Sequence, residues 1–573
     1  MKKVKPGTFL KESLKSAGSS PGRIGTRMSI LQQIGTLTAT AGGNVGIGRI
    51  GIALAGIVLA GFICYAGALK NPFIWDDEKT VVSNDFIRDW KNAPRVFTRS
   101  LFGEKLEGVS FYRPLQSFSY FFDYALWNDD PAGYHLTNLI LHILNGFLIF
   151  FIFKKLPFFS AKNRELAAFF TALLFVIHPV QTEAVVYVSG RGDILAVLFA
   201  LCSFLFFLKN SFVPVMLFYI LAILSKENIV IFPLIPFIMI LLYRDIDRNG
   251  GRQHRHWEKK CLAGLFSIFL FYAALRIILL KTSSTGVLSL INEASFIERA
   301  ATFPRILLTY IRLAVFPVDL HMEYHFVEKS ILNPYVFLGM PILISALFFL
   351  LKTKSAPVLF ALGWFAAGLL PFNNVFTPLH STLREHWLYF SMIGFSALTV
   401  FLFIALLNKF SSAGKIVLFL CAASVVFYFV RGTMARSLEW KNPIEFYRKD
   451  LSYEPESFLM WNNLGVEYWR RREWRAAAEC FTNAINVSPG KKYGIAYNNL
   501  GVVYEATGEK EKALGLYEES IRLSNYNLAY GNLGRFLIEE GRVPEAREVL
   551  EKGISYYPQD AEIRKQERRL TIE

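Results

Sequence analysis

The chain has 573 residues, 53% of them hydrophobic and 53 of them phenylalanine, and its mean hydropathy is +0.33. Soluble domains are usually less apolar, so the composition excludes an ordinary soluble protein and predicts a polytopic membrane protein with a soluble part. The net charge of +16 does not indicate nucleic-acid binding, because the basic residues flank apolar segments, as they do in membrane proteins.

Residues 1–49 form a basic extension that carries eight lysines or arginines and one acidic residue, Glu12. This stretch is far longer than the start of a signal peptide, and the apolar segment 50–69 is long enough to cross a membrane at about 1.5 Å per residue. We therefore expect a cytoplasmic extension followed by a retained first span. The five cysteines show no spacing typical of a disulfide framework or a zinc site.

Apolar segments of span length, or somewhat shorter where helices are buried among others, predict about eleven spans. They lie at 50–69, 134–153, 165–180, 193–209, 213–225, 229–243, 261–280, 333–351, 356–372, 387–408 and 415–431. Residues 303–318 contain two arginines and two prolines, so we expect a re-entrant or interfacial segment there. The basic loops then fall on the cytoplasmic side, and the C-terminal region falls outside. The multi-span region is 50–431, with an external loop at 71–133.

Three adjacent carboxylates, Asp76, Asp77 and Glu78, follow the first span. Such side chains at a membrane surface are costly unless they meet water, a cation or a reaction. A solvated loop is the simpler interpretation. We interpret them as part of a functional site because four further polar clusters are expected on the same side of the membrane.

The second cluster combines Arg113 with a polar stripe on the second span. His135, Asn138, His142 and Asn145 follow the spacing i, i+3, i+7 and i+10, which places them on one helical face. Such a face is expected to look toward protein or a water-filled cavity and away from lipid.

The third and fourth clusters lie at breaks between apolar segments. The third contains His178, Glu183, Arg191 and Asp193, and the fourth contains Lys226 and Glu227. A polar hairpin in which Asp193 caps the next helix is an alternative for the third cluster. A structural ion pair is an alternative for the fourth.

The fifth cluster joins two segments on either side of the eighth and ninth spans. It contains Asp319, His321, Glu323, Arg384, Glu385 and His386. Carboxylates suit base chemistry or a divalent ion, whereas arginine and lysine suit a phosphate. The sequence contains no zinc-ligand spacing, glycine-rich phosphate loop or GxSxG motif. A substrate that is apolar at one end and phosphorylated at the other, such as a polyprenyl-phosphate sugar, fits this inventory.

From Trp440 onward the sequence becomes charged and amphipathic, and a repeat appears. Gly465, Gly501 and Gly534 mark three units, about 458–491, 494–527 and 527–560, whose spacing is close to the 34-residue period of tetratricopeptide repeats (TPR). Such repeats stack into an α-solenoid that binds peptides or proteins. We therefore predict a TPR domain over 432–573, with a purely structural solenoid as the alternative.

Six motifs in order resemble a known family. They are FIWDDE at 73–78, FYRPL at 111–115, YHLTNLILH at 134–142, HPVQTEAV at 178–185, GRGDILA at 190–196 and LSKEN at 224–228. With the C-terminal repeats, they resemble transmembrane-and-TPR-containing O-mannosyltransferases over roughly 50–573. The resemblance implies an all-α, GT-C-like glycosyltransferase that takes a sugar from a lipid-phosphate donor outside the membrane. It also implies mannose transfer to Ser/Thr of extracytoplasmic proteins.

The resemblance guides the assignment of roles. We expect Asp76 or Asp77, with Asp77 slightly preferred, to act as general base in an inverting single displacement. The expected substrate-binding residues are Glu78, Arg113, His135, His178, Glu183, Arg191, Asp193, Lys226, Glu227, Arg384 and Glu385. Within this set, Arg191, Arg384 and Lys226 are assigned to the donor phosphate. No cofactor is assigned, and a divalent ion at Asp76, Asp77 and Glu78 is an open alternative.

The loop and tail sizes, with Asn486-Val487-Ser488 as the only clear glycosylation motif, favour a bacterial inner-membrane protein with an extracytoplasmic TPR domain. Two other functions stay open at this stage. One is a GT-C enzyme that glycosylates a lipid or an envelope polysaccharide. The other is a non-catalytic membrane scaffold whose repeats recruit a partner protein.

Overall fold

The computed structural model describes residues 45–101, 111–157, 161–243, 252–279, 289–330, 332–558 and 560–570. The chain divides into two compact units, Met1–Ala55 and Gly56–Glu573. In the first unit the structure describes only the beginning of helix α2 (Val45–Tyr65), so the predicted extension 1–49 lies almost entirely outside the described residues. The described residues are mainly helical and form no β-strand, although an isolated bridge joins Tyr324 and Leu383. The predicted all-α fold class is confirmed.

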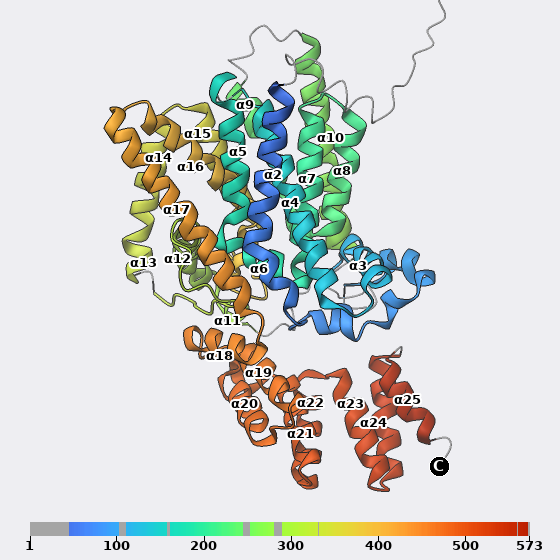
Figure 1. Cartoon of the computed structure of the whole chain (residues 1–573). Coiled ribbons are helices and arrows are strands. Elements are labelled where there is room, and N and C mark those ends of the chain that lie inside the picture. Colours follow the sequence, from blue (N-terminus) through green and yellow to red (C-terminus); the bar gives the residue numbers. More distant parts are fainter. Residues whose placement is uncertain are drawn as a thin grey trace, which may run out of the picture. The chain divides into compact units, whose positions relative to one another are not determined.

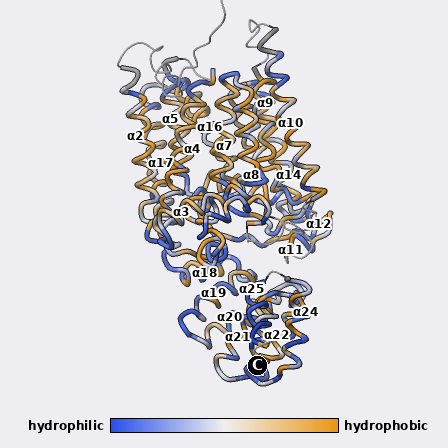
Figure 2. The backbone as a smooth tube through the Cα atoms, turned by 90° about the vertical axis from the view of Figure 1, so that its right-hand side faces the viewer, coloured by the Kyte–Doolittle hydropathy of each residue, from blue (hydrophilic) through white to orange (hydrophobic). Residues whose placement is uncertain are grey.

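Five helical segments of the described chain are long and apolar enough to cross a membrane. They are Gly48–Lys70, Pro131–Lys155, Val188–Phe207, His256–Ile278 and Ser412–Glu439. A sixth span results if Asn163–Ile177 and Pro179–Val186, which meet at 55°, count as one. Several apolar helices of this kind indicate a membrane protein. Figure 2 shows their predominantly hydrophobic colouring.

The predicted number of eleven spans is not supported by this count. Shorter apolar helices occupy the remaining predicted positions, at Phe212–Ser225, Glu227–Leu242, Pro334–Phe349, Ala356–Phe372 and Ser391–Leu407. They are too short because polar residues interrupt the apolar sequence; Lys226, for example, separates two of them. Helix α12 (Phe296–Val315) is not among the candidate spans, in agreement with the expectation for 303–318.

Contacts between helices organise the apolar part of the second unit. Helix α4 (Pro131–Lys155) packs against α5 (Ala161–Ile177) and α7 (Arg191–Phe207). Helix α7 also packs against α8 (Phe212–Ser225), which in turn contacts α10 (Arg252–Leu279), and α7, α8 and α10 lie side by side in Figure 1. The remaining apolar helices are α9 (Leu234–Tyr243), α14 (Gly339–Lys352), α15 (Ala356–Leu369), α16 (Ser391–Leu407) and α17 (Ser412–Glu439).

The loop predicted at 71–133 is folded around an apolar core of its own. Short helices cover 78–98, and helix α3 (Pro114–Trp127) follows residues 102–110, which lie outside the described structure. Val81, Ile87, Tyr120 and Phe121 are buried together there with Val188. This core holds the carboxylate segment against the start of α7.

The C-terminal region contains three helix pairs with the packing expected of TPR units. The pairs are α19 (Phe458–Arg470) with α20 (Trp474–Val487), α21 (Gly494–Ala506) with α22 (Lys510–Ser524), and α23 (Asn527–Glu539) with α24 (Val543–Tyr556). The pairs are seen in Figure 1, preceded by α18 (Pro443–Tyr453) and followed by α25 (Ala561–Leu570). A Cβ added at Gly465 would lie 2.6 Å from the Phe481 ring, and one at Gly534 would lie 2.4 Å from Leu550. Only glycine therefore allows the paired helices to approach this closely.

Candidate active site

The carboxylate segment after the first span is held in an unusual backbone conformation. Trp75 has a φ of 56°, in the left-handed region that non-glycine residues rarely adopt. The turn directs the next two residues, Asp76 and Asp77, to different partners. The indole ring of Trp75 lies under the guanidinium of Arg384, with 5.2 Å between Cζ and the ring centroid. Strain at this residue is therefore offset by a cation–π contact.

Asp77 is held by hydrogen bonds to both of its carboxylate oxygens. Its Oδ1 accepts hydrogen bonds from the backbone N–H of Ser189 at 2.8 Å and from the Ser189 hydroxyl at 2.6 Å. Its Oδ2 accepts a longer bond from the N–H of Ile74 at 3.3 Å. Burial raises the pKa of Asp77 to about 7, and these hydrogen bonds oppose the rise. Because both oxygens are engaged, the side chain fixes the loop to the start of α7.

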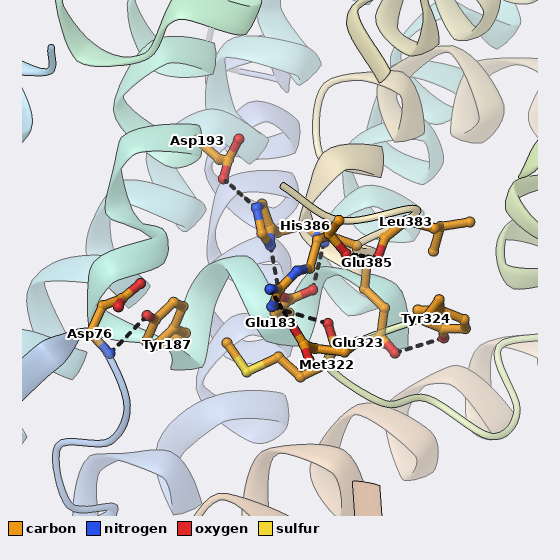
Figure 3. Close-up of polar contacts among 12 residues, drawn as sticks. Asp76, Glu183, Tyr187, Asp193, Met322, Glu323, Tyr324, Leu383, Glu385 and His386 are labelled. Atoms are coloured by element: carbon orange, nitrogen blue, oxygen red, sulfur yellow. Dashed lines mark hydrogen bonds and ion pairs between the residues drawn. The ribbon is translucent and has the colours of Figure 1, made fainter. Parts of the chain in front are cut away.

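Asp76 has different surroundings. Its backbone N–H donates to the Tyr187 hydroxyl at 3.2 Å, as Figure 3 shows. Asp76 is only partly buried. Among the described residues, its carboxylate forms no ion pair. Burial raises the pKa of Asp76, while Tyr187, Lys79 and Arg384 act in the opposite direction. A carboxylate with a raised pKa and no ion-pair partner suits proton abstraction, so the structure favours Asp76 over the slightly preferred Asp77.

Arg384 is positioned by a carboxylate on the facing segment. Its Nη2 donates to Glu323 Oε1 at 2.5 Å, and its Nη1 donates to the Met322 carbonyl at 3.3 Å. The bridge between Tyr324 and Leu383 brings these two segments together. Within the described structure, Nε of Arg384 is buried without a hydrogen-bond partner. An arginine with one unused donor can still bind an oxyanion.

Glu183 and Asp193 orient His386 from two sides (Figure 3). Glu183, which is 0% exposed, accepts from the His386 backbone N–H at 2.8 Å and from its Nδ1 at 2.7 Å. Asp193 Oδ2 lies 4.0 Å from His386 Nε2 and 2.5 Å from Lys226 Nζ. The third, fourth and fifth clusters of the sequence therefore meet at one place.

Three cations surround the same place. Arg113 is held by Glu227 through two hydrogen bonds of 2.9 and 2.8 Å. Burial lowers the pKa of His380 to about 3, and the positive charges of Arg384, Arg113 and Lys226 lower it further. The same charges act on His386. A site with several partly neutralised cations around partly buried histidines of lowered pKa suits a phosphate.

Arg191 is paired inside the protein, and these contacts do not support its predicted role at the donor phosphate. Its side chain is 0% exposed and forms an ion pair with Asp123. Its Nε donates to Asn138 Oδ1 at 2.7 Å, and its Nη2 donates to the Tyr134 carbonyl at 3.1 Å. All of these partners belong to the protein, so Arg191 joins α3, α4 and α7 and does not face a donor phosphate.

The predicted histidines His135 and His178 also have partners inside the protein. His135 Nε2 donates to the Asn71 carbonyl at 3.1 Å. Both ring nitrogens of His178 are used, since Nε2 donates to the Ala314 carbonyl at 2.9 Å and Nδ1 accepts from Val180 N–H at 3.3 Å. The other members of the stripe also bond within the protein: Asn138 to the Val185 and Tyr187 carbonyls, His142 to the Tyr389 hydroxyl and Asn145 to the Ile194 carbonyl.

The other two predicted acidic residues have partners outside the cation cluster. Glu385 is buried and accepts from the Tyr324 hydroxyl at 3.1 Å, with Arg436 Nη2 at 3.8 Å. Glu78 forms an ion pair of 2.6 Å with Arg470 of α19. Neither geometry indicates direct substrate contact.

The structure adds Tyr187 and Ser457, which the sequence analysis did not single out. Ser457 Oγ donates to Glu323 Oε2 at 2.6 Å. A hydroxyl that pairs with a carboxylate far along the chain leaves no pattern in the sequence, so no signal was available for either residue.

For the divalent ion, the described part of the chain contains no group of three or more His, Cys, Asp or Glu arranged to hold a metal. Asp77 in particular has both oxygens engaged by N–H and O–H donors.

Comparisons with known proteins agree with the sequence resemblance. Two family models, both described as tetratricopeptide repeat, match residues 456–525 and 528–560. A protein O-mannosyl-transferase of Caenorhabditis elegans is 25% identical over 443 residues, 74% of this chain and 61% of that protein. Protein O-mannosyl-transferase TMTC3 of Homo sapiens is 23% identical over 553 residues, 86% of this chain and 59% of that protein.

A shorter stretch is more similar to another relative. Protein O-mannosyl-transferase TMTC1 of Homo sapiens is 38% identical over 149 residues, 25% of this chain and 16% of that protein. The chain thus spans about three fifths of the length of the first relatives. Among solved structures, a chain of the APC/C hetero-tetramer Cut9-Hcn1 matches at 12% identity, and the match covers 80% of this protein and 89% of the matched chain. Its TM-score of 0.25 is too low to support any conclusion. The resemblance to protein O-mannosyl-transferases with TPR repeats is confirmed.

Proposed function

We propose that the chain is a membrane glycosyltransferase that moves mannose from a polyprenyl-phosphate donor to Ser/Thr hydroxyls of extracytoplasmic proteins. The names of its relatives support the sugar and the protein acceptor. The observation that carries the proposal is the position of Asp76, a partly buried carboxylate that forms no ion pair with any described residue and follows Trp75, whose ring lies under Arg384 of the cation cluster.

The proposed reaction is a single displacement. Asp76 accepts the proton of the acceptor hydroxyl, and the acceptor oxygen forms a bond to the anomeric carbon. The bond between that carbon and the phosphate oxygen breaks, and its electron pair leaves with the polyprenyl phosphate. One displacement without an enzyme nucleophile inverts the configuration at the sugar. General-base assistance of this kind contributes typically about 10²–10⁴-fold.

The cations stabilise the leaving phosphate. Arg384, Lys226 and Arg113 contribute positive charge, and the Nε of Arg384 has no hydrogen-bond partner among the described residues. Glu323, Asp193 and Glu227 hold these three side chains in place before the donor binds. Charge that is already oriented needs no reorganisation during the reaction, so it lowers the barrier more than mobile cations would.

The charge distribution supports the proposed location. The basic extension and basic loops are placed in the cytoplasm, which puts the carboxylate segment and the TPR region on the outer face. In a bacterial cell this is the periplasmic face of the inner membrane. The repeats would then engage the acceptor protein or a partner in the compartment in which transfer occurs.

The test uses the purified full-length protein in proteoliposomes that contain radiolabelled polyprenyl-phosphate mannose. Label should enter an added extracytoplasmic protein fraction, and Asp76→Asn should lower the rate by about 10²–10⁴-fold. Asp85→Asn is the matched control, because the Asp85 side chain lies in the same loop and is 91% exposed.

Three results would count against this function. Label that partitions into lipid or polysaccharide would assign a different acceptor. Absence of transfer with mannose, glucose and other polyprenyl-phosphate sugars would favour the scaffold. Full activity of Asp76→Asn would remove Asp76 from the mechanism.

A further inference from the structure

Both ends of the first repeat helix contact the candidate active site. Helix α19 begins after its N-cap residue Ser457. The Ser457 hydroxyl accepts from the Met460 N–H at 3.2 Å, as a cap does, and donates to Glu323 Oε2 at 2.6 Å. Ser457 is 0% exposed and Glu323 is 1% exposed. A short, buried bond to a carboxylate is among the stronger hydrogen bonds in proteins.

The contact at Ser457 continues to the leaving-group side of the site. Glu323 also accepts from Arg384 Nη2 at 2.5 Å and from His325 Nε2 at 2.9 Å. Arg384 in turn covers the Trp75 ring. Glu323 therefore links the first turn of the repeat domain to the arginine that is proposed to hold the phosphate.

The other end of α19 contacts the base side of the site. Arg470, the last residue of α19, forms an ion pair of 2.6 Å with Glu78, two residues after Asp76. Tyr447 of α18 adds an aromatic contact with Trp75, with 6.4 Å between the ring centroids. The Arg470 and Glu78 side chains are 38% and 41% exposed, so this ion pair is weaker than the bond at Ser457.

We propose that α19 is a positioning element of the reaction centre, with Ser457 as its principal positioning residue. A helix of 13 residues is about 20 Å long and rigid, so it can fix the separation between two segments that it touches at its ends. One segment carries Arg384 through Glu323, and the other carries Asp76. The repeat domain then contributes to the geometry of transfer in addition to any acceptor recruitment. This inference rests on the proposed function.

The two roles predict different kinetics. A repeat domain that only recruits the acceptor would affect KM for a protein acceptor and would leave a short peptide acceptor unaffected. A positioning helix affects kcat even for a short Ser/Thr peptide, because a small displacement of reacting groups lowers the rate strongly. It also affects the affinity for polyprenyl phosphate, because Arg384 is displaced.

The experiment compares Ser457→Ala with Ser457→Thr in the full-length protein, using transfer to a short peptide and binding of polyprenyl phosphate. Ser457→Ala should lower kcat by about tenfold or more and weaken polyprenyl-phosphate binding by a similar factor, with KM for the peptide unchanged. Ser457→Thr keeps a hydroxyl that can cap α19 and donate to Glu323, so it should stay within about threefold of wild type.

Two controls separate positioning from general stability. Ser411→Ala removes the N-cap of α17, whose hydroxyl accepts from the Gly414 N–H, without touching Glu323. It should leave kcat within about threefold.

Charge reversal at the other end of α19, with Glu78→Arg and Arg470→Glu, should lower kcat in each single variant and restore it in the double variant. Lys510→Glu, which disrupts the ion pair between Lys510 and Glu540 in the later repeats, should leave kcat unchanged.

The outcomes distinguish the two proposals. Wild-type rates and wild-type polyprenyl-phosphate binding in Ser457→Ala would overturn the positioning role while the proposed function stands. If the wild-type protein binds polyprenyl phosphate but transfers no sugar, the proposed function is overturned; weaker binding in Ser457→Ala would then support only the part of the proposal in which Ser457 positions the phosphate-binding arginine. A wild-type protein that neither binds polyprenyl phosphate nor transfers sugar would overturn both.

Discussion

Replacing Arg191 tests whether this buried arginine is structural or binds substrate. The guanidinium is 0% exposed and pairs with Asp123, which is 2% exposed. It also donates to Asn138 Oδ1 at 2.7 Å and to the Tyr134 carbonyl at 3.1 Å. Arg191→Met fills a similar volume but removes every one of these donors.

The expected destabilisation follows from the groups that are left behind. Removing one partner of a buried ion pair typically costs about 3–5 kcal/mol, because an uncompensated charge remains, here on Asp123. The unpaired Asn138 Oδ1 adds about 1 kcal/mol or more. If Asp123→Leu is combined with Arg191→Met, no buried charge remains, and about 1–3 kcal/mol from lost hydrogen bonds should persist.

The measurement is thermal unfolding in detergent, followed by intrinsic tryptophan fluorescence, for wild type, the two single variants and the double variant. The two single variants should show a much lower apparent Tm than wild type, and the double variant should lie between them and wild type. The assignment would be refuted by Arg191→Met that unfolds at the wild-type temperature but no longer binds polyprenyl phosphate.

Three further predictions concern the carboxylates of the site. Since burial raises the pKa of Asp76 above its ordinary 3.8, the acidic limb of kcat/KM against pH should lie above pH 3.8, and a limb at or below 3.8 would contradict its role as base. Asp77→Asn keeps an oxygen that can accept both Ser189 bonds, so it should transfer sugar within about tenfold of the wild-type rate. Asp77→Ala leaves the Ser189 N–H unpaired, so it should lower the free energy of unfolding by about 1–3 kcal/mol, which is measured as a lower apparent Tm. Burial raises the pKa of Asp77 to about 7 and that of Glu385 to about 8, so the folded protein holds protons that the unfolded chain has released. Stability is therefore expected to fall between pH 4 and pH 8. An apparent Tm that rises over this interval, or a slope unchanged by Asp77→Asn, would show that these carboxyls do not control it.

The fold class and the repeats could be predicted because both depend on local patterns. Apolar segments, basic flanks and the spacing of Gly465, Gly501 and Gly534 are periodic or compositional features, and tertiary contacts do not alter them. The number of spans was harder to predict, because an apolar segment such as 213–225 can be a complete span or a short helix buried among neighbours. Length in the sequence does not distinguish these cases.

The candidate site could be located but not resolved into roles. The sequence indicates that charged and polar residues cluster, and the structure does bring Glu183, Asp193, Lys226 and Arg384 together. The sequence does not indicate which charges neutralise each other inside the protein. The pairing of Arg191 with Asp123 joins two helices far apart in the chain, so charge alone could not separate a structural ion pair from a phosphate ligand.

The left-handed backbone of Trp75 also constrains which residues this position can accept. Glycine would adopt a φ of 56° without the cost that a side chain incurs there, of order 1–3 kcal/mol. Trp75→Gly would relieve that cost and would lose the contacts with Arg384 and Tyr447 together. Selection for stability alone and selection for a fixed reaction geometry therefore favour different residues at position 75. Variants recovered under each regime would show which of the two demands the protein meets there.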